Sequence, residues 1–275
     1  MRSVLRRLVL RLLWLGRGID FSIRHPWARE SRVRLNLFRH KGYLYHGSRR
    51  EAGTMALFQA LLRPGQVAFD VGAHIGWITL WLAQLVGPQG RVLAFEPGSN
   101  NLGYLRRNVA PLPQVRLMEA AVGEAEGQAT LFEESLTGQN NAIGAPYHRL
   151  AGNAAANVAA PRITERSVAM VTLDAVAARQ GLRPDLVKID VEGHEFAVLR
   201  GMPGLLAEAP PVLLLEITRD HAAILALLQG AGYQLFAAHT GALRRVASAQ
   251  ELSFNTLALH PSRHQAAFGA LGLLV

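Results

Sequence analysis

The segment Asp70-Val71-Gly72-Ala73-His74-Ile75-Gly76 constrains the fold of this chain more than any other feature. It follows the apolar run Val67–Phe69, and Glu96 closes the next apolar run twenty residues beyond Gly76. In a βαβ unit, glycines at a strand-to-helix turn let the backbone approach a ligand, and a later acid accepts hydrogen bonds from ribose hydroxyls. The pattern therefore predicts a nucleoside pocket at the edge of a parallel sheet.

Strand-like and helix-like patterns alternate through most of the chain. Strands are expected at 67–70, 91–96, 115–121, 186–190, 212–217, 234–237 and 256–259. Helices are expected at 54–62, 77–86, 101–109, 173–179, 195–206 and 222–231. The alternation predicts the α/β class, with a Rossmann-like, mostly parallel sheet covered by helices on both faces. Residues 135–165 lack a sustained period, so they are expected to leave the sheet as a substrate-side lid or a disordered loop.

Positive charge is concentrated at one end of the chain. Residues 1–50 hold thirteen Arg or Lys residues against two acidic ones, whereas the whole chain has a net charge of +9. The remaining residues therefore carry a small net negative charge, which argues against a groove for nucleic acid. We expect a basic arm or cap at 1–50 and one catalytic or binding domain at 51–275.

The first fifteen residues have the pattern of a basic amphipathic helix. The expected apolar face contains Val4, Leu5, Leu8, Leu12 and Leu15, and the opposite half contains Arg2, Arg6, Arg7 and Arg11. The run has no small-residue cleavage site and is far shorter than the roughly 20 apolar residues that span a bilayer. Two interpretations stay open, because residues 1–18 could cap their own domain or lie on an anionic membrane.

Composition narrows the chemistry further. The chain has 0 cysteines, which excludes disulfides and thiolate sites and fits a cytoplasmic, reducing compartment, with peripheral membrane contact through the arm as the alternative. His74 stands where a dinucleotide fingerprint has its central glycine, which weakens the case for NAD or FAD. A nucleoside without phosphates needs less space next to the backbone of the turn. Carboxylates that face a positively charged group suit S-adenosylmethionine, which is such a nucleoside.

Six motifs in order along the chain resemble one known family. They are DVGAHIG, AFEPGSNN, AAVGEAEG, VTLDAV, LVKIDVEGHEFAVLRG and VLLLEI, and they cover about residues 66–218. This order is similar to that of the FkbM-type family of S-adenosylmethionine-dependent methyltransferases, with residues 254–258 resembling its closing strand. The resemblance implies a class I methyltransferase fold with a seven-stranded, mostly parallel sheet.

The resemblance also implies which residues hold the cofactor. Asp70, Gly72, Ala73, His74 and Gly76 would hold its methionine part, Glu96 its ribose, Pro97 and Asn101 the border of the nucleoside, and Ala121 the adenine. Two positions depart from the family pattern. His74 replaces the usual Asn, and the segment 98–101 replaces an Asp-Pro-Glu-Asn sequence.

A second group of acids follows two later strands. Asp190 ends the run at 186–190, so it should emerge at the carboxyl edge of the sheet, where both Asp190 and Glu192 can point toward the cofactor and Asp190 can contact it. These acids could orient an acceptor hydroxyl or take its proton. His194 suits a general base, although a histidine near a helix start is often a capping or surface residue. Glu216 is a further candidate that could equally bind a neighbouring loop.

The expected activity is O-methylation of a hydroxyl on a sugar, a glycan or a secondary metabolite. Asp190, Glu192 and His194 could in principle ligate magnesium, but no second set of carboxylates accompanies them, so no metal is expected. Neither a nucleic-acid partner nor a particular oligomeric state is predicted. The alternatives are an NAD(P)-dependent oxidoreductase and a noncatalytic binding module docked on a membrane.

Overall fold

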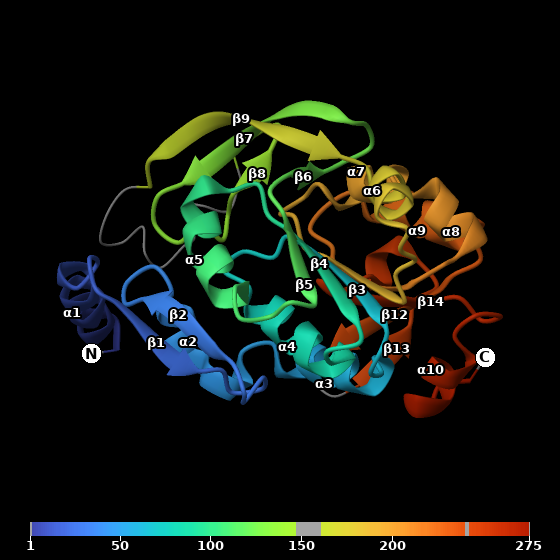
Figure 1. Ribbon diagram of the computed structural model, residues 1–275, viewed down its shortest axis with the longest axis horizontal. Helices are drawn as coiled ribbons and strands as arrows, with labels where there is room; N and C mark the ends of the chain where they lie inside the picture. Colours follow the sequence, from blue (N-terminus) through green and yellow to red (C-terminus); the bar gives the residue numbers. More distant parts are fainter. Residues whose placement is uncertain (1, 147–160, 240–241, 275) are drawn as a thin grey trace.

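The computed structural model describes residues 2–146, 161–239 and 242–274 (Figure 1). The strands of its main sheet are β3 (Val67–Val71), β4 (Arg91–Phe95), β5 (Val115–Met118), β10 (Leu186–Ile189), β11 (Val212–Glu216), β12 (Gln234–His239), β13 (Ala242–Arg245) and β14 (Asn255–Leu259). Their order is β13-β12-β14-β11-β10-β3-β4-β5. The five strands from β5 to β11 are parallel to their neighbours, whereas β14 runs antiparallel to β11 and β12, and β13 antiparallel to β12.

The sheet differs from the expected one in strand number and direction. Seven mostly parallel strands were expected, and the structure has eight strands in a mixed sheet. The additional strand, β13, pairs only with β12 and is mostly exposed. Its sequence Ala-Leu-Arg-Arg lacks the apolar alternation that marks a half-buried strand, so it gave no signal.

Central strands are apolar on both faces, which explains why helices cover both sides of the sheet. Phe69 and Val71 belong to one core cluster, whereas Ala68 between them belongs to another. This alternation follows from the two-residue period of a strand. The first cluster packs against α6 (Leu173–Gln180), α7 (Glu195–Arg200), α8 (Pro203–Glu208) and α9 (His221–Gly230). The second packs against α3 (Ala52–Leu61), α4 (Trp77–Val86) and α10 (Gln265–Ala270).

The single helix expected at 195–206 is two short helices. Helix α7 ends at Arg200, and α8 begins at Pro203. Proline lacks the backbone N–H and fixes its own φ, so it is tolerated in the first turn of a helix but not inside one. Pro203 therefore sets the break. The remaining long helix of the sheet domain, α5 (Ser99–Val109), follows β4 and packs against Ala73 and Ala94.

A second sheet was not expected from the sequence. It contains β6 (Ala121–Val122), β7 (Gly127–Glu134), β8 (Ala142–Ile143) and β9 (Ile163–Val171), in the order β6-β9-β7-β8. Figure 1 shows it beside the main sheet, between α5 and α6. Most side chains of β9 are exposed or half-buried, so its sequence lacks a clear apolar face. The expected lid at 135–165 lies partly in β8 and β9 and partly, at 147–160, outside the described residues.

The N-terminal segment combines a helix and a hairpin. It contains α1 (Arg2–Leu15), the antiparallel strands β1 (Asp20–Arg24) and β2 (Arg32–Asn36), α2 (Lys41–His46) and the 3-10 turn η1 (Gly47–Arg49). Leu13 and Trp14 of α1 pack on Phe38, with the two aromatic rings edge to face at 4.9 Å. In the part of α1 whose side chains are described, the expected apolar face is not the packed one, because Leu12 and Leu15 are 59% and 76% exposed. Among the described residues no helix is long and apolar enough to cross a bilayer.

Candidate functional site

A cavity of about 450 Å³ opens at the point where the strand order of the main sheet reverses. After β3 the chain continues outward through β4 and β5, whereas β10 and β11 extend the sheet on the other side of β3. In open α/β sheets, ligands bind at such a switch point, outside the carboxyl ends of the strands. The cavity lies there, between the ends of β3, β4, β10 and β11, and its size suits a small-molecule site.

The glycine turn after β3 forms one wall of this cavity. The backbone N–H groups of Gly72 and Ala73 both donate to the Phe95 carbonyl, at 3.0 and 2.9 Å, which joins the turn to β4. Gly72 has a φ of +83°, and a Cβ there would overlap the carbonyl oxygen of Asp190. A side chain at this position would therefore separate β3 from β10, so the turn requires glycine.

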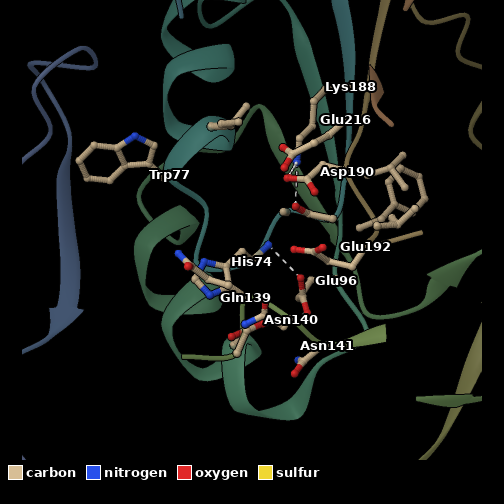
Figure 2. A pocket seen from close by; sticks show the side chains of 18 of the residues that line it. His74, Trp77, Glu96, Gln139, Asn140, Asn141, Lys188, Asp190, Glu192 and Glu216 are labelled. Atoms are coloured by element: carbon tan, nitrogen blue, oxygen red, sulfur yellow. Dashed lines mark hydrogen bonds and ion pairs between the residues drawn. The ribbon is translucent and has the colours of Figure 1, made fainter. Parts of the chain in front are cut away.

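Glu96 lies at the centre of a hydrogen-bond cluster beside that turn. Its Oε2 accepts from the backbone N–H of His74 at 2.8 Å, and its Oε1 accepts from the Gly98 N–H at 2.8 Å and from Asn101 Nδ2 at 3.1 Å. Burial raises the pKa of the Glu96 carboxyl to about 7, although the bonds from Asn101, Gly98 and His74 oppose this shift. Figure 2 shows the His74 bond at the cavity wall.

His74 links the turn to two other segments. Its Nδ1 lies 2.9 Å from the hydroxyl of Tyr43 in α2, and its Nε2 lies 3.3 Å from the carbonyl of Thr137. Burial lowers the pKa of His74 well below its ordinary value, so the ring is neutral. Its φ of +53° is a left-handed conformation in which Asn and His are enriched. The replacement of Asn by His thus keeps the backbone geometry and adds a contact with the N-terminal segment.

Two residues expected to touch the cofactor lie behind the wall instead. The Asp70 side chain is 0% exposed; its Oδ2 accepts from Thr79 Oγ1 at 2.6 Å, and its Oδ1 lies 3.4 Å from Lys188 Nζ. Gly76, with a φ of +88°, packs against Leu105. Neither residue is part of the cavity lining. In this structure both support the turn from behind.

Lys188 ties the two strands at the switch point together. Its buried ammonium group donates to the Gly72 carbonyl at 2.9 Å and lies 3.3 Å from the Asp190 carboxylate. Burial alone would lower the pKa of Lys188, but the carboxylates of Asp190 and Asp70 outweigh it and raise the pKa. The lysine therefore stays charged and holds Asp190 at the cavity.

Four acidic side chains line the same end of the cavity: Glu51, Asp190, Glu192 and Glu216. In Figure 2 the carboxyl groups of Asp190 and Glu216 lie close to Lys188, with Glu192 toward Glu96. Burial and the nearby Asp190 carboxylate raise the pKa of Glu216 well above its ordinary value. Glu216 is therefore protonated at neutral pH and can donate a hydrogen bond.

His194 also lines the cavity, at the N-cap position of α7. Its side chain makes no capping hydrogen bond, so capping does not explain it. Burial, and then the charge of Arg219, lower its pKa, which leaves the imidazole neutral and able to accept a proton. Its Nε2 has no hydrogen-bond partner among the described residues and faces Gly123, the residue that follows β6.

Several lining residues gave no signal in the sequence. Tyr43, His46, Arg49, Arg50 and Glu51 come from the N-terminal segment, and Leu131 and the loop at 138–143 come from the second sheet. A substrate-side lid was expected at 135–165, but its individual residues were not identified. Their roles depend on long-range packing that no local pattern encodes. In the described part of the chain no group of three or more His, Asp or Glu residues could hold a metal ion.

The wall around Glu96 fits the nucleoside half of S-adenosylmethionine. Glu96 and Asn101 both line the cavity, and Asn101 Oδ1 is a buried acceptor without a partner among the described residues. A Cβ at Gly98 or Gly138 would collide with Asn141 or Asn101, so backbone closely surrounds these acceptors. Ala121 and Pro97 are lining residues too, as expected. The polar side chains that line this wall are carboxylates and amides, which suit ribose hydroxyls and a positively charged sulfur.

These features define a nucleoside-binding α/β domain with an acidic site beside the nucleoside wall. Residues 70–235, well over half of the chain, match the family model of the methyltransferase FkbM domain. The chain belongs to this family, whose cofactor is S-adenosylmethionine. The alternative of an NAD(P)-dependent oxidoreductase is not consistent with this family.

Individual relatives match part of the chain. Methyltransferase sdnD of Sordaria araneosa is 29% identical over 153 residues, which are 48% of this chain and 59% of that protein. Hexuronic acid methyltransferase AglP of Haloferax volcanii is 28% identical over 143 residues, 51% of each chain. The match thus spans about half the length of these curated relatives. A crystal structure of methyltransferase FkbM from Methylobacillus flagellatus KT covers 74% of this chain and 50% of that one, with a TM-score of 0.46 and 15% identity.

Proposed function

We propose that this chain transfers a methyl group from S-adenosylmethionine to a hydroxyl of a small molecule or glycan. The observation that carries the proposal is one continuous cavity that joins the Glu96 wall to the Asp190, Glu216 and His194 end. The first part suits a nucleoside, and the second suits a hydroxyl and its proton. The Haloferax volcanii relative is named a hexuronic acid methyltransferase, which favours a sugar acceptor.

The residues of the chain align the acceptor and remove its proton. When bound, S-adenosylmethionine supplies a methyl group on a positively charged sulfur. The methyl group would pass to the acceptor oxygen and leave S-adenosylhomocysteine, so correct alignment of the hydroxyl by the chain would supply much of the acceleration. Asp190, held by Lys188, accepts a hydrogen bond from the acceptor, and protonated Glu216 donates one. His194 takes the hydroxyl proton, at Nδ1 because Nε2 faces Gly123.

The first test is turnover by variants of the acidic end. Because general bases typically contribute 10²- to 10⁴-fold, His194→Ala is expected to lower kcat by about two orders of magnitude without weakening S-adenosylmethionine binding. Asp190→Asn is expected to lower kcat/KM for the acceptor by a similar factor. Release of S-adenosylhomocysteine in an acceptor screen measures both effects. His221→Ala, a histidine outside the cavity lining, is the control. Normal turnover by both variants would contradict the catalytic assignment.

We also propose that the arm at 1–18 contacts an anionic membrane surface. Large apolar side chains of the arm are exposed at Val9, Leu12 and Leu15, and the neighbouring Arg11 and Arg17 are exposed as well. Leu13 and Trp14 anchor the same helix on the domain, so α1 caps the domain and still presents an uncovered apolar face. Apolar side chains beside arginines suit the headgroup region of anionic lipid.

Vesicle pelleting tests the membrane contact. Leu12→Glu/Leu15→Glu is expected to lower binding to vesicles that contain 30% phosphatidylserine by about tenfold, because it adds two repelled charges and removes apolar contact. Ala56→Glu/Gln59→Glu adds the same charges to the exposed face of α3 and should leave binding near that of the unaltered chain. Equal pelleting of all three proteins would exclude the arm as the contact.

A further inference from the structure

Basic residues also line the cavity, close to its acidic residues, and form a basic lip. Lining residues His46, Arg49 and Arg50 come from the end of α2 and the η1 turn, whereas the acidic residues come mainly from the ends of β10 and β11. A ligand in the cavity therefore meets groups of both signs of charge. The basic lip is formed by other residues than the Glu96 wall that fits the nucleoside.

The two arginines of this lip differ in their partners. The Arg50 guanidinium lies 3.2 Å from the Glu51 carboxylate and 4.1 Å from the centre of the Tyr43 ring, so its charge is already balanced within the protein. Arg49 makes no hydrogen bond or ion pair with any residue in the described ranges, and its side chain is exposed. The His46 ring lies edge to face with the exposed ring of Tyr45, at 4.9 Å.

An arginine that lines a cavity and has no ion-pair partner can bind an anionic ligand. The planar guanidinium binds a carboxylate through two parallel hydrogen bonds, which gives both affinity and orientation. The acidic end would repel an anionic group. An acceptor with one anionic group is therefore oriented, with that group at the lip and its hydroxyl directed to Asp190, Glu216 and His194.

We propose that Arg49, assisted by His46, binds an anionic group of the methyl acceptor, and that the acceptor is a hydroxyl compound that carries a carboxylate. This inference rests on the proposed function, because it names the acceptor class for the same cavity. Arg49 is a binding residue for the acceptor and takes no part in the methyl transfer. The lip does not hold the carboxylate of S-adenosylmethionine, and the experiment separates these two assignments.

Equilibrium binding tests the proposal without turnover. Calorimetry on the full chain saturated with S-adenosylhomocysteine compares D-glucuronate with D-glucose, which differ only in the carboxylate, and includes D-glucose 6-phosphate as a second anion. Glucuronate is expected to bind at least tenfold more tightly than glucose, and Arg49→Gln should abolish this difference. Arg49→Lys keeps the positive charge but loses the two parallel hydrogen bonds of the guanidinium, so it should retain part of the preference for glucuronate. Arg183→Gln removes an exposed charge outside the cavity lining and should change nothing.

Three results would overturn the proposal. The first is no preference for glucuronate, including no binding of any sugar. The second is a preference that survives Arg49→Gln. The third is a loss of S-adenosylmethionine affinity greater than threefold in Arg49→Gln, which would place the carboxylate of the cofactor at the lip. Tighter binding of the phosphate than of glucuronate would correct the anion to a phosphoryl group. The proposed function fails separately, if the unaltered chain does not bind S-adenosylmethionine.

Discussion

Replacement of Glu96 by glutamine is expected to weaken S-adenosylmethionine binding by about two orders of magnitude. The carboxylate offers about four lone-pair sites and uses three of them for His74, Gly98 and Asn101, so one site on Oε2 stays free for a ribose hydroxyl. Hydrogen bonds to charged groups contribute about 1.5–3 kcal/mol each. The glutamine amide would also place a donor against N–H groups that now donate to Glu96. Calorimetric titration with S-adenosylmethionine measures the loss.

Glu119→Gln is the matched control for this substitution. Glu119 is an exposed carboxylate that pairs with Arg106 outside the cavity, so the same chemical change should leave cofactor affinity unaltered. Thermal unfolding without cofactor separates lost binding from lost structure. Unchanged affinity in the folded Glu96→Gln protein would contradict the assignment of Glu96 to the ribose.

The pH dependence of cofactor binding follows from the same carboxyl. Burial raises the pKa of Glu96 to about 7 in the free protein, and a ribose hydroxyl that donates to it favours the ionised form. Binding therefore requires loss of a proton below pH 7, and the dissociation constant should rise by up to tenfold for each pH unit as the pH falls from 7. Above pH 7 the affinity should be constant. Glu96→Gln should remove the dependence below pH 7.

Local patterns predicted those parts of the fold that bury both faces of a strand or one face of a helix. Helix 77–86 and the strands that begin at Val67, Arg91 and Leu186 occur as expected, because continuous apolar runs and flanking glycines mark them. The strands β7, β9 and β13 were missed, since none carries such a period: β9 and β13 are exposed or half-buried, and β7 buries Glu133 and Glu134 at its end. Their pairing is a property of the assembled chain.

In the candidate site, too, local sequence patterns predicted some features, whereas others depend on how the whole chain folds. The sequence placed Glu96, Asp190 and Glu216 at strand ends, and the structure brings all three to one cavity, because parallel strands share a carboxyl edge. Asp70 was expected at the cofactor because the family resemblance implies it, yet its side chain points to Lys188 and Thr79 inside the protein. The position of a residue at the end of a strand does not determine the face of the sheet on which its side chain lies, or the cation with which that side chain pairs. The basic lip depends on how the N-terminal segment folds back, which no motif records.

Lys188→Met is expected to destabilise the protein by about 3–5 kcal/mol, a large part of the 5–15 kcal/mol that typically stabilises a domain. The lysine side chain is 6% exposed and lies between Asp70 and Asp190, so its removal leaves the buried Asp70 carboxylate and the partly exposed Asp190 carboxylate without their counter-ion. It also removes the hydrogen bond to Gly72 that joins β10 to the turn. Urea unfolding at pH 7 measures the loss, and a loss below 1 kcal/mol would contradict the argument.

The uncompensated charge of Asp70 should account for much of that loss, and a second substitution tests this. Asp70→Asn keeps the size of the side chain and an acceptor for Thr79 while removing the charge. Lys188→Met/Asp70→Asn should therefore be more stable than Lys188→Met alone, with a coupling free energy of about 1–3 kcal/mol. Lowering the pH should also stabilise Lys188→Met, because an unpaired buried carboxyl has a raised pKa and its destabilising effect appears only above that pKa. If instead the second substitution destabilises further, lost packing rather than charge explains the effect of Lys188→Met.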